Sequence, residues 1–413
     1  MSRTPTMRSR RPRTIVVVAL FVLAVVVGVL PTRGSGPLAP APAAAVPWWQ
    51  PIIGPGGLDQ IEPDETRDVN GWRYTRYRNE GAPCSMDGVQ SFLIGTRIDA
   101  PETATAPLWV RMRGGGAGWF EDGVPMPSAA VKSEEDFATH LHYDTQGLMA
   151  DAKAEIEPLR VLIVSMCSHD LYGGMNSPDP GNIHGDDWPT TGLTSLVAAL
   201  AYTTAQYPTD DYVLHGTSAG GVGTFHVAMA LQMAGYPPTA LVSDSGVGNH
   251  AWQEYVAANP PDEDVCEKVT QARIDGVDAR IDPRVADPAN EPHLLVSTRR
   301  LLVPVAHVWN LNDHNVCGKE MLAQCPLADG MGPAMRAARC NHEPLRRALL
   351  GLGPLSTSME MRVCVEGDDP TVRCDRHLVT AGPDLTNDPN MNEWPADYQA
   401  ELLDWVLERL AED

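Results

Sequence analysis

Apolar runs of strand length alternate with longer helical patterns along most of the chain. Runs rich in Val, Ile and Leu, or strictly alternating stretches bounded by Gly, Pro, Asn or Asp, predict strands, whereas apolar positions three and four apart predict helices. The predicted strands cover 72–78, 91–100, 107–112, 161–166, 212–214, 240–243, 302–309 and 359–365, and the clearest predicted helices cover 192–206 and 395–410. This alternation favours a doubly wound, mostly parallel sheet with helices on both faces.

The stretch Tyr212–Met233 predicts a strand, a tight turn and a helix in succession. The turn is Gly216-Thr217-Ser218-Ala219-Gly220, and a helix of small residues follows it. A serine hydroxyl is a poor nucleophile unless a sharp turn projects it toward an external base, and such a strained turn admits only very small neighbours. The backbone N–H of Ala219 would then point to where an oxyanion forms, and the helix N-terminus adds positive potential.

This pentapeptide is a weak signal by itself. In a chain this rich in glycine, a G-x-S-x-G sequence arises by chance in about one chain in five. The alternative is a glycine-rich helix start after a buried strand. The strand-turn-helix context favours Ser218 as a nucleophile.

A glycine cluster directly follows the predicted strand 107–112. The residues Gly114-Gly115-Gly116-Ala117-Gly118-Trp119 expose backbone N–H groups with no side chain in the way. A flexible turn is the simplest alternative. Upstream of a serine turn, however, such a loop suits the oxyanion hole of an α/β-hydrolase.

A nucleophilic serine also needs a histidine base and a carboxylate that holds the tautomer of that histidine. In α/β-hydrolases the acid follows a later strand and the histidine follows the last one. Asp313 follows the predicted strand 302–309, and His377 follows the predicted strand 359–365, so we predict these two residues as acid and base. Asp244 comes one strand too early and is expected to be a structural hydrogen-bonder. The remaining competitors are less well placed, being too close to Ser218, ahead of the last strand or adjacent to the base: His215, His226, His314, His342 and Asp375.

The N-terminus has the pattern of an export signal. Five arginines between Arg3 and Arg13 precede an apolar run at 15–30, and a Pro/Ala stretch ends at Ala43-Ala44-Ala45. These are a basic region, a hydrophobic region and a small-residue cleavage site. We expect a secreted or extracytoplasmic protein, with an uncleaved membrane anchor through 15–30 as the alternative. Residues 1–45 are therefore a leader or anchor with its linker, 48–413 are one domain, and the polar, proline-punctuated segment 260–292 is interpreted as an insertion.

The net charge and the cysteine content indicate which partners and which cross-links to expect. The formal net charge is −22, and removal of residues 1–45, which hold six arginines and no acidic residue, changes it to −28. Such a surface repels nucleic acids and anionic lipids. Eight cysteines in an exported chain favour disulfides, and without any C-x-x-C pair a structural metal is not expected. Cys364 with Cys374 would brace the loop of His377. We expect a monomer that needs no cofactor and acts on a small-molecule or carbohydrate acyl ester.

Several separated segments together resemble the pectin acetylesterase and Notum family of serine carboxylesterases, especially its bacterial members. The resemblance implies Ser218, Asp313 and His377 as the triad, with the oxyanion bound by backbone N–H groups of Gly116, Ala117 and Ala219. Gly118 stands where the family pattern has a cysteine, and the regions around the acid and base match loosely. The matching segments, which span about residues 70 to 380, are Cys84-Ser85-Met86-Asp87-Gly88, Gly114–Trp119, Cys167-Ser168-His169-Asp170 and His215–Thr224.

The sequence thus predicts an exported hydrolase of carboxylic esters that works through a serine acyl-enzyme. A peptidase or an acyltransferase would use the same triad with another leaving group or acceptor. A catalytically silent surface-binding protein is the third alternative.

Overall fold

A nine-stranded sheet forms the centre of the structure. Its strand order is β1-β2-β3-β7-β4-β10-β11-β12-β13. The strands from β7 to β13 in this order run parallel to one another, whereas β1, β2 and β3 pair antiparallel at one side. The bounds are β1 Ile61–Val69, β2 Trp72–Pro83, β3 Val89–Arg97, β7 Arg160–Val164, β4 Leu108–Met112, β10 Tyr212–Thr217, β11 Ala240–Asp244, β12 Val305–Asn310 and β13 Thr357–Met361.

The computed structural model describes residues 46–85, 88–121, 123–126, 135–144, 147–179, 189–246, 271–310, 333–361, 379–380 and 396–412. The predicted leader, residues 1–45, lies outside these ranges. The chain from Val46 to Asp413 forms one unit. Within the described ranges, no helix has both the length and the apolar character needed to cross a bilayer.

Helices and two short hairpins surround the sheet. The hairpins are β5 Trp119–Glu121 with β6 Val124–Met126, and β8 Ser177–Pro178 with β9 Pro189–Thr190. The helices are α1 Gln50–Ile53, α2 Phe137–Asp144, α3 Gly147–Glu155, α4 Gly192–Gln206, α5 Ala219–Met233, α7 Gln271–Asp278, α8 Pro283–Ala286, η2 Pro288–Asn290, α9 Pro292–Ser297, α10 Pro333–Leu350, η4 Gly353–Leu355 and α11 Ala396–Leu410.

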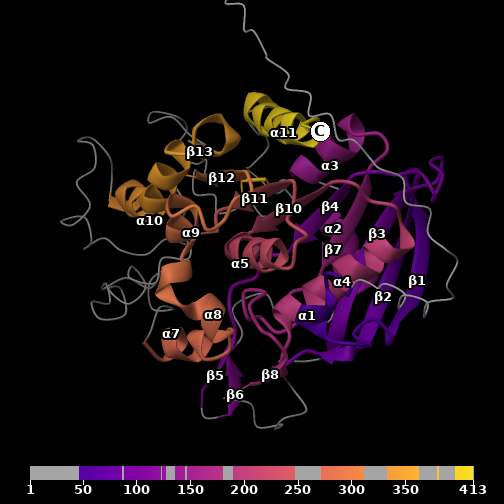
Figure 1. The fold of residues 1–413 in the computed structure, drawn as a ribbon, viewed down its shortest axis with the longest axis horizontal. Helices are drawn as coiled ribbons and strands as arrows, with labels where there is room; N and C mark the ends of the chain where they lie inside the picture. Colours follow the sequence, from indigo (N-terminus) through magenta and orange to yellow (C-terminus); the bar gives the residue numbers. More distant parts are fainter. Residues whose placement is uncertain are drawn as a thin grey trace, which may run out of the picture. The chain divides into compact units, whose positions relative to one another are not determined.

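Alternate residues of the central strands enter two different apolar cores, because successive side chains of a strand point to opposite faces. In β4, Leu108, Val110 and Met112 pack with α4 and α5 on one face, whereas Trp109 packs with α3 and α11 on the other. Figure 1 shows α4 and α5 over one side of the strands, and α3 beside α11 at the other. A mostly parallel sheet covered on both faces is the α/β-hydrolase arrangement that the sequence predicts.

The predicted elements recur with small shifts at their ends. Helix α4 has the predicted bounds, and its apolar residues Leu193, Leu196, Val197 and Leu200, which lie on one face, are buried. Strand β12 begins at Val305 and not at the predicted residue 302, because Pro304 has no N–H to donate to the ladder. Strand β1 is not among the predicted strands. It is a largely exposed edge strand with a bulge next to Pro63, so it carries little apolar pattern.

Candidate active site

The residues singled out from the sequence follow the carboxyl ends of neighbouring parallel strands. The glycine-rich loop follows β4, Ser218 follows β10, and Asp244 is the last residue of β11. The ladder aligns Gly216 with Met112 and Thr217 with Asp244, so these three strand ends lie side by side. In open α/β sheets, ligands bind in the crevice outside this edge.

The turn at Ser218 has the strained geometry that a projecting nucleophile requires. Ser218 has φ 52° and ψ −119°, a conformation that costs a non-glycine residue about 1–3 kcal/mol. A Cβ on Gly216 would lie 2.1 Å from the carbonyl oxygen of Gly220, and one on Gly220 would lie 2.5 Å from that of Met112. Both flanking positions therefore require glycine, as the motif predicts. Ser218 itself is partly exposed, at the start of the 15-residue helix α5.

The glycine-rich loop lies against this turn. A Cβ built on Gly114 would lie 2.8 Å from the carbonyl oxygen of Thr217 and 3.0 Å from the Cβ of Ser218. Gly115 and Gly116 have φ of 140° and 74°. The backbone of the loop is thus within reach of the region in front of Ser218, where the predicted oxyanion donors Gly116, Ala117 and Ala219 belong. The convergence of their N–H groups on one point stays a prediction.

Arg280, which the sequence analysis did not single out, holds the far end of this loop. Its side chain is almost completely buried, and Nε donates to Oδ2 of Asp179 at 2.7 Å. The guanidinium also donates to the backbone oxygens of Gly118 and Ser168. A buried charge needs such partners, because burial without them is very costly. In the sequence, Arg280 lies in the polar, proline-punctuated segment 260–292, where nothing distinguishes it from a solvent-exposed arginine.

His169 sits beside the same loop. Its backbone oxygen accepts from the N–H of Gly118 at 2.8 Å, and its φ is 50°. Burial, together with the nearby guanidinium groups of Arg280 and Arg113, lowers the pKa of His169 to about 4. Neither ring nitrogen has a hydrogen-bond partner within the described part of the chain. A neutral, buried imidazole therefore lies close to the predicted oxyanion loop.

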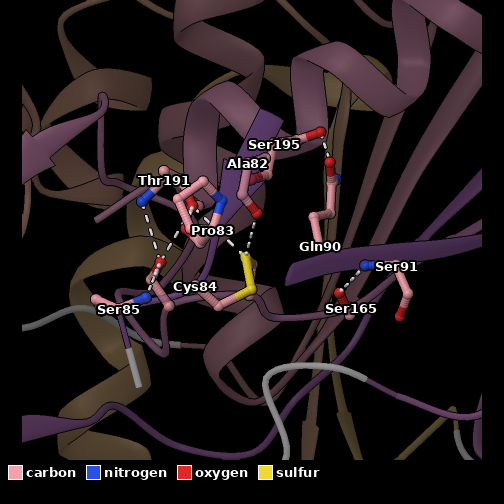
Figure 2. The surroundings of a disulfide bond; sticks show 12 residues. Ala82, Pro83, Cys84, Ser85, Gln90, Ser91, Ser165, Thr191 and Ser195 are labelled. Atoms are coloured by element: carbon pink, nitrogen blue, oxygen red, sulfur yellow. Dashed lines mark hydrogen bonds between the residues drawn. A yellow bond between two sulfur atoms is a disulfide. The ribbon is translucent and has the colours of Figure 1, made fainter. Parts of the chain in front are cut away.

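A disulfide joins the segments on which His169 and the first family-like motif lie. Cys84 follows β2 and pairs with Cys167, which follows β7, across 83 residues of sequence. Figure 2 shows the polar groups around it, and the hydroxyl of Thr191 lies 3.5 Å from Sγ of Cys167. The backbone N–H of Thr191 donates to the hydroxyl of Ser168 at 3.0 Å. This pairing could not be predicted from the sequence, since eight cysteines allow many connectivities.

Asp244 is a structural hydrogen-bonder, as the sequence analysis expects. Its backbone oxygen accepts from the N–H of Ser218 at 2.8 Å. Its buried carboxylate accepts from the backbone N–H groups of Val379 and Thr380, at 2.9 Å and 2.6 Å. One aspartate thus binds both the nucleophile turn and a segment that begins two residues after His377.

Four of the described histidines, His215, His226, His307 and His342, make structural contacts. His226 donates to the backbone oxygen of Leu171 at 3.0 Å, which makes it unsuited to serve Ser218. His307 and His342 are hydrogen-bonded to each other at 2.8 Å, and His342 stacks on Trp309. His215 is bound at both ring nitrogens. These contacts favour a structural role for His215, His226 and His342, which are the described competitors for the role of base.

Two of the three predicted triad residues, Asp313 and His377, lie outside the described residues, as do the competitors His314 and Asp375 and the pair Cys364 and Cys374. Their roles stay predictions. Within the ranges that the structure describes, no three His, Cys, Asp or Glu side chains are grouped as metal ligands.

A cavity of about 410 Å³ is lined in part by Arg280. Its lining includes Ser177, Asp278, Asp282 and Asp287, and it does not include Ser218. We do not assign it to the substrate.

Comparison with known proteins gives structural likenesses only. No model of a known protein family matches the chain, and no curated protein matches its sequence. Brefeldin A esterase, a bacterial homologue of human hormone sensitive lipase, is 15% identical with a TM-score of 0.46, over 91% of this chain and 89% of that one. A fungal esterase from Rhizomucor miehei is 14% identical with a TM-score of 0.44, over 88% of both chains. A thermostable esterase from Pseudomonas putida is 16% identical with a TM-score of 0.42, over 85% of this chain and 83% of that one. Likeness at this level assigns no activity to this chain, and membership of the pectin acetylesterase and Notum family stays a prediction.

Proposed function

We propose that the chain is a serine hydrolase of carboxylic esters. The observation that carries this proposal is the strained turn at Ser218, which opens helix α5 and lies against the glycine-rich loop after β4. The helix start leaves its first backbone N–H groups without intrahelical partners, and the helix dipole places positive potential there. Amide groups around a projecting hydroxyl are the arrangement that stabilises a tetrahedral oxyanion.

Asp313 and His377 complete the proposed triad. Two peptide units keep the Cα atom of His377 within about 7 Å of that of Val379. Val379 donates to the carboxylate of Asp244, and the backbone oxygen of Asp244 accepts from the N–H of Ser218. Chain connectivity therefore supports His377 as the base. Asp313 comes three residues after β12, which pairs with β11, and so follows the next strand end along the same edge.

In the proposed reaction, His377 accepts the proton of Ser218 as the hydroxyl attacks the ester carbonyl, and Asp313 holds the tautomer of the imidazole. The oxyanion binds to the N–H groups of Gly116, Ala117 and Ala219. The alcohol leaves with the proton from His377, and water then releases the acid from the acyl-enzyme.

The substrate proposed is a neutral or small O-acyl ester, and the family resemblance suggests an acetyl or a longer acyl group. A net charge of −28 after loss of residues 1–45 opposes the approach of a polyanion such as de-esterified pectin. We also propose export, on the basis of the N-terminal pattern. Turnover of acetylated xylan and acetylated pectin at low and high salt tests the charge argument. A clear preference for pectin at low salt would refute it.

The decisive experiment is hydrolysis of nitrophenyl esters from acetate to palmitate. We expect Ser218→Ala and His377→Ala each to lose at least about 10³-fold in kcat. Matched controls are Ser177→Ala, at an exposed serine, and His293→Ala, in helix α9 beside Glu291. Unchanged ester turnover in Ser218→Ala would sink the proposal. Paired amide substrates and alcohol acceptors, assayed beside the esters, would expose a peptidase or an acyltransferase.

A further inference from the structure

Four buried side chains form a continuous hydrogen-bonded chain beneath the proposed site. Nε1 of Trp109, on β4, donates to Nδ1 of His215, on β10, at 3.2 Å. Nε2 of His215 lies 2.8 Å from the hydroxyl of Thr380. That hydroxyl donates to Oδ2 of Asp244, on β11, at 2.7 Å. The contacts span sequence separations of 106, 165 and 136 residues.

The direction of each proton in this chain follows from the chemistry of its ends. The indole of Trp109 only donates, so Nδ1 of His215 is an acceptor and its ring is neutral. Nε2 then carries the hydrogen and donates to the hydroxyl of Thr380. A carboxylate only accepts, so that hydroxyl gives its own hydrogen to Asp244. Burial and the nearby Arg111 lower the pKa of His215 well below its usual value, which agrees with the neutral ring.

The carboxylate of Asp244 has no capacity left for a catalytic imidazole. Oδ1 accepts from the N–H of Val379 at 2.9 Å and from the hydroxyl of Ser245 at 2.8 Å. Oδ2 accepts from Val379 and from both the N–H and the hydroxyl of Thr380. A carboxylate offers about four lone-pair sites, and these five contacts fill them. Asp244 therefore acts as an anchor.

We propose that this chain of side chains is a positioning device for the catalytic base, with Thr380 and Asp244 as its positioning residues. This inference rests on the proposed function, because it takes His377 as the base. Thr380 follows His377 by three residues, and its backbone oxygen also accepts from the N–H of Leu148 in helix α3. Val379 and Thr380 are thus bound directly to β10, β11 and helix α3, and through His215 to β4. The placement of Val379 and Thr380 relative to Ser218 is therefore fixed by buried contacts.

The test is Thr380→Val, which keeps the branched shape and removes the hydroxyl. Two contacts are lost, and Nε2 of His215 becomes a buried donor without its partner. We expect kcat for nitrophenyl acetate to fall about 10- to 100-fold, because misplacement by about 1 Å costs a factor of this size. KM should stay within about threefold, and the acid limb of the kcat/KM profile should move by about half a pH unit. Thr380→Ser restores the hydroxyl and should recover most of kcat.

The matched control is Thr203→Val. Thr203 is equally buried, and its hydroxyl donates to the backbone oxygen of Ala199 within helix α4, away from the base. It should lose some stability and keep its kcat and pH profile. Wild-type kcat and pH profile in folded Thr380→Val would overturn the positioning role while leaving the ester hydrolase intact, provided that Ser218→Ala remains inactive.

A second comparison covers the case in which Thr380→Val fails to fold. If Asp313 is the triad acid and Asp244 only anchors the segment, Asp313→Asn should lose about 10⁴-fold in kcat, because the imidazole of His377 then has the wrong tautomer. Asp244→Asn should lose about 10- to 100-fold and speed hydrogen exchange at Val379 and Thr380. The reverse order, with Asp244→Asn the more damaging and Asp313→Asn active, would make Asp244 the triad acid and overturn the inference.

Discussion

Replacing Gly220 by alanine perturbs the contact between the nucleophile turn and the oxyanion loop. An added Cβ would lie 2.5 Å from the carbonyl oxygen of Met112 and 2.6 Å from that of Arg113. An ordinary van der Waals contact is at least 3.4 Å, so helix α5 and the end of β4 must separate by about 0.9 Å. Both neighbours are backbone, so no side-chain rotation relieves the overlap. Overpacking of this kind costs about 1–3 kcal/mol.

The larger effect should fall on catalysis. Ser218 and Ala219 move with the helix, whereas Gly116 and Ala117 follow β4, so the gap opens across the proposed oxyanion hole. We expect kcat for nitrophenyl acetate to fall about 100-fold in a protein that is still folded. The control is Gly81→Ala, where the atoms nearest to the added Cβ belong to side chains, Oε1 of Gln60 at 3.2 Å and Oδ1 of Asn79 at 3.3 Å. Full kcat in folded Gly220→Ala would refute the assignment of this contact to the site.

Three further predictions concern stability. The bond between Cys84 and Cys167 closes a loop of 83 residues, for which the chain-entropy relation gives about 4.5 kcal/mol, so the double serine variant should lower the free energy of unfolding in urea by about 2–5 kcal/mol. Arg280→Met removes the buried guanidinium that binds Asp179 and should cost about 3–5 kcal/mol, whereas the exposed Arg284→Met should cost under about 0.5 kcal/mol; equal melting temperatures would contradict this. Buried histidines bind protons only once unfolded, since their folded pKa values of about 3 to 4 lie below the ordinary 6.5. Their contribution to the free energy of unfolding is complete above pH 6.5 and is lost toward pH 3, by up to about 1.4 kcal/mol per pH unit for each histidine. The histidines concerned are His140, His226 and His307. The urea midpoint should therefore fall from pH 7 to pH 5, and an unchanged midpoint would contradict this prediction.

The parts of the fold that the sequence predicts well are those in which one periodicity dominates. Helix α4 and strands β4, β10 and β11 are buried, so their apolar runs are long and bounded by turn residues. Elements with mixed character are not found in this way. Strand β1 is polar and exposed, and helix α10 contains Pro344, which ordinarily argues against a helix.

In the candidate site, too, the local features could be predicted from the sequence and the long-range contacts could not. The strained turn at Ser218 is local, so its glycines are visible in five consecutive residues. Arg280 becomes part of the site only through contacts with Gly118, 162 residues away, and with Asp179, 101 residues away. No spacing rule encodes such distant pairs.

The hydrogen-bonded side chains of Trp109, His215, Thr380 and Asp244 are the clearest example of contacts that the sequence does not reveal. Trp109 meets His215 because β4 and β10 are adjacent, and Asp244 meets Thr380 because the chain returns past β11 before helix α11. In the sequence, His215 is only a histidine three residues before the nucleophile, and its nearness to Ser218 argues against a role as base. In the fold, His215 lies on the strand that leads to Ser218 and binds Thr380 from there. A neutral imidazole buried beside the turn can hold a distant segment in register with the nucleophile, and a ring whose pKa lies well below its usual value suits that task better than one that titrates near neutral pH.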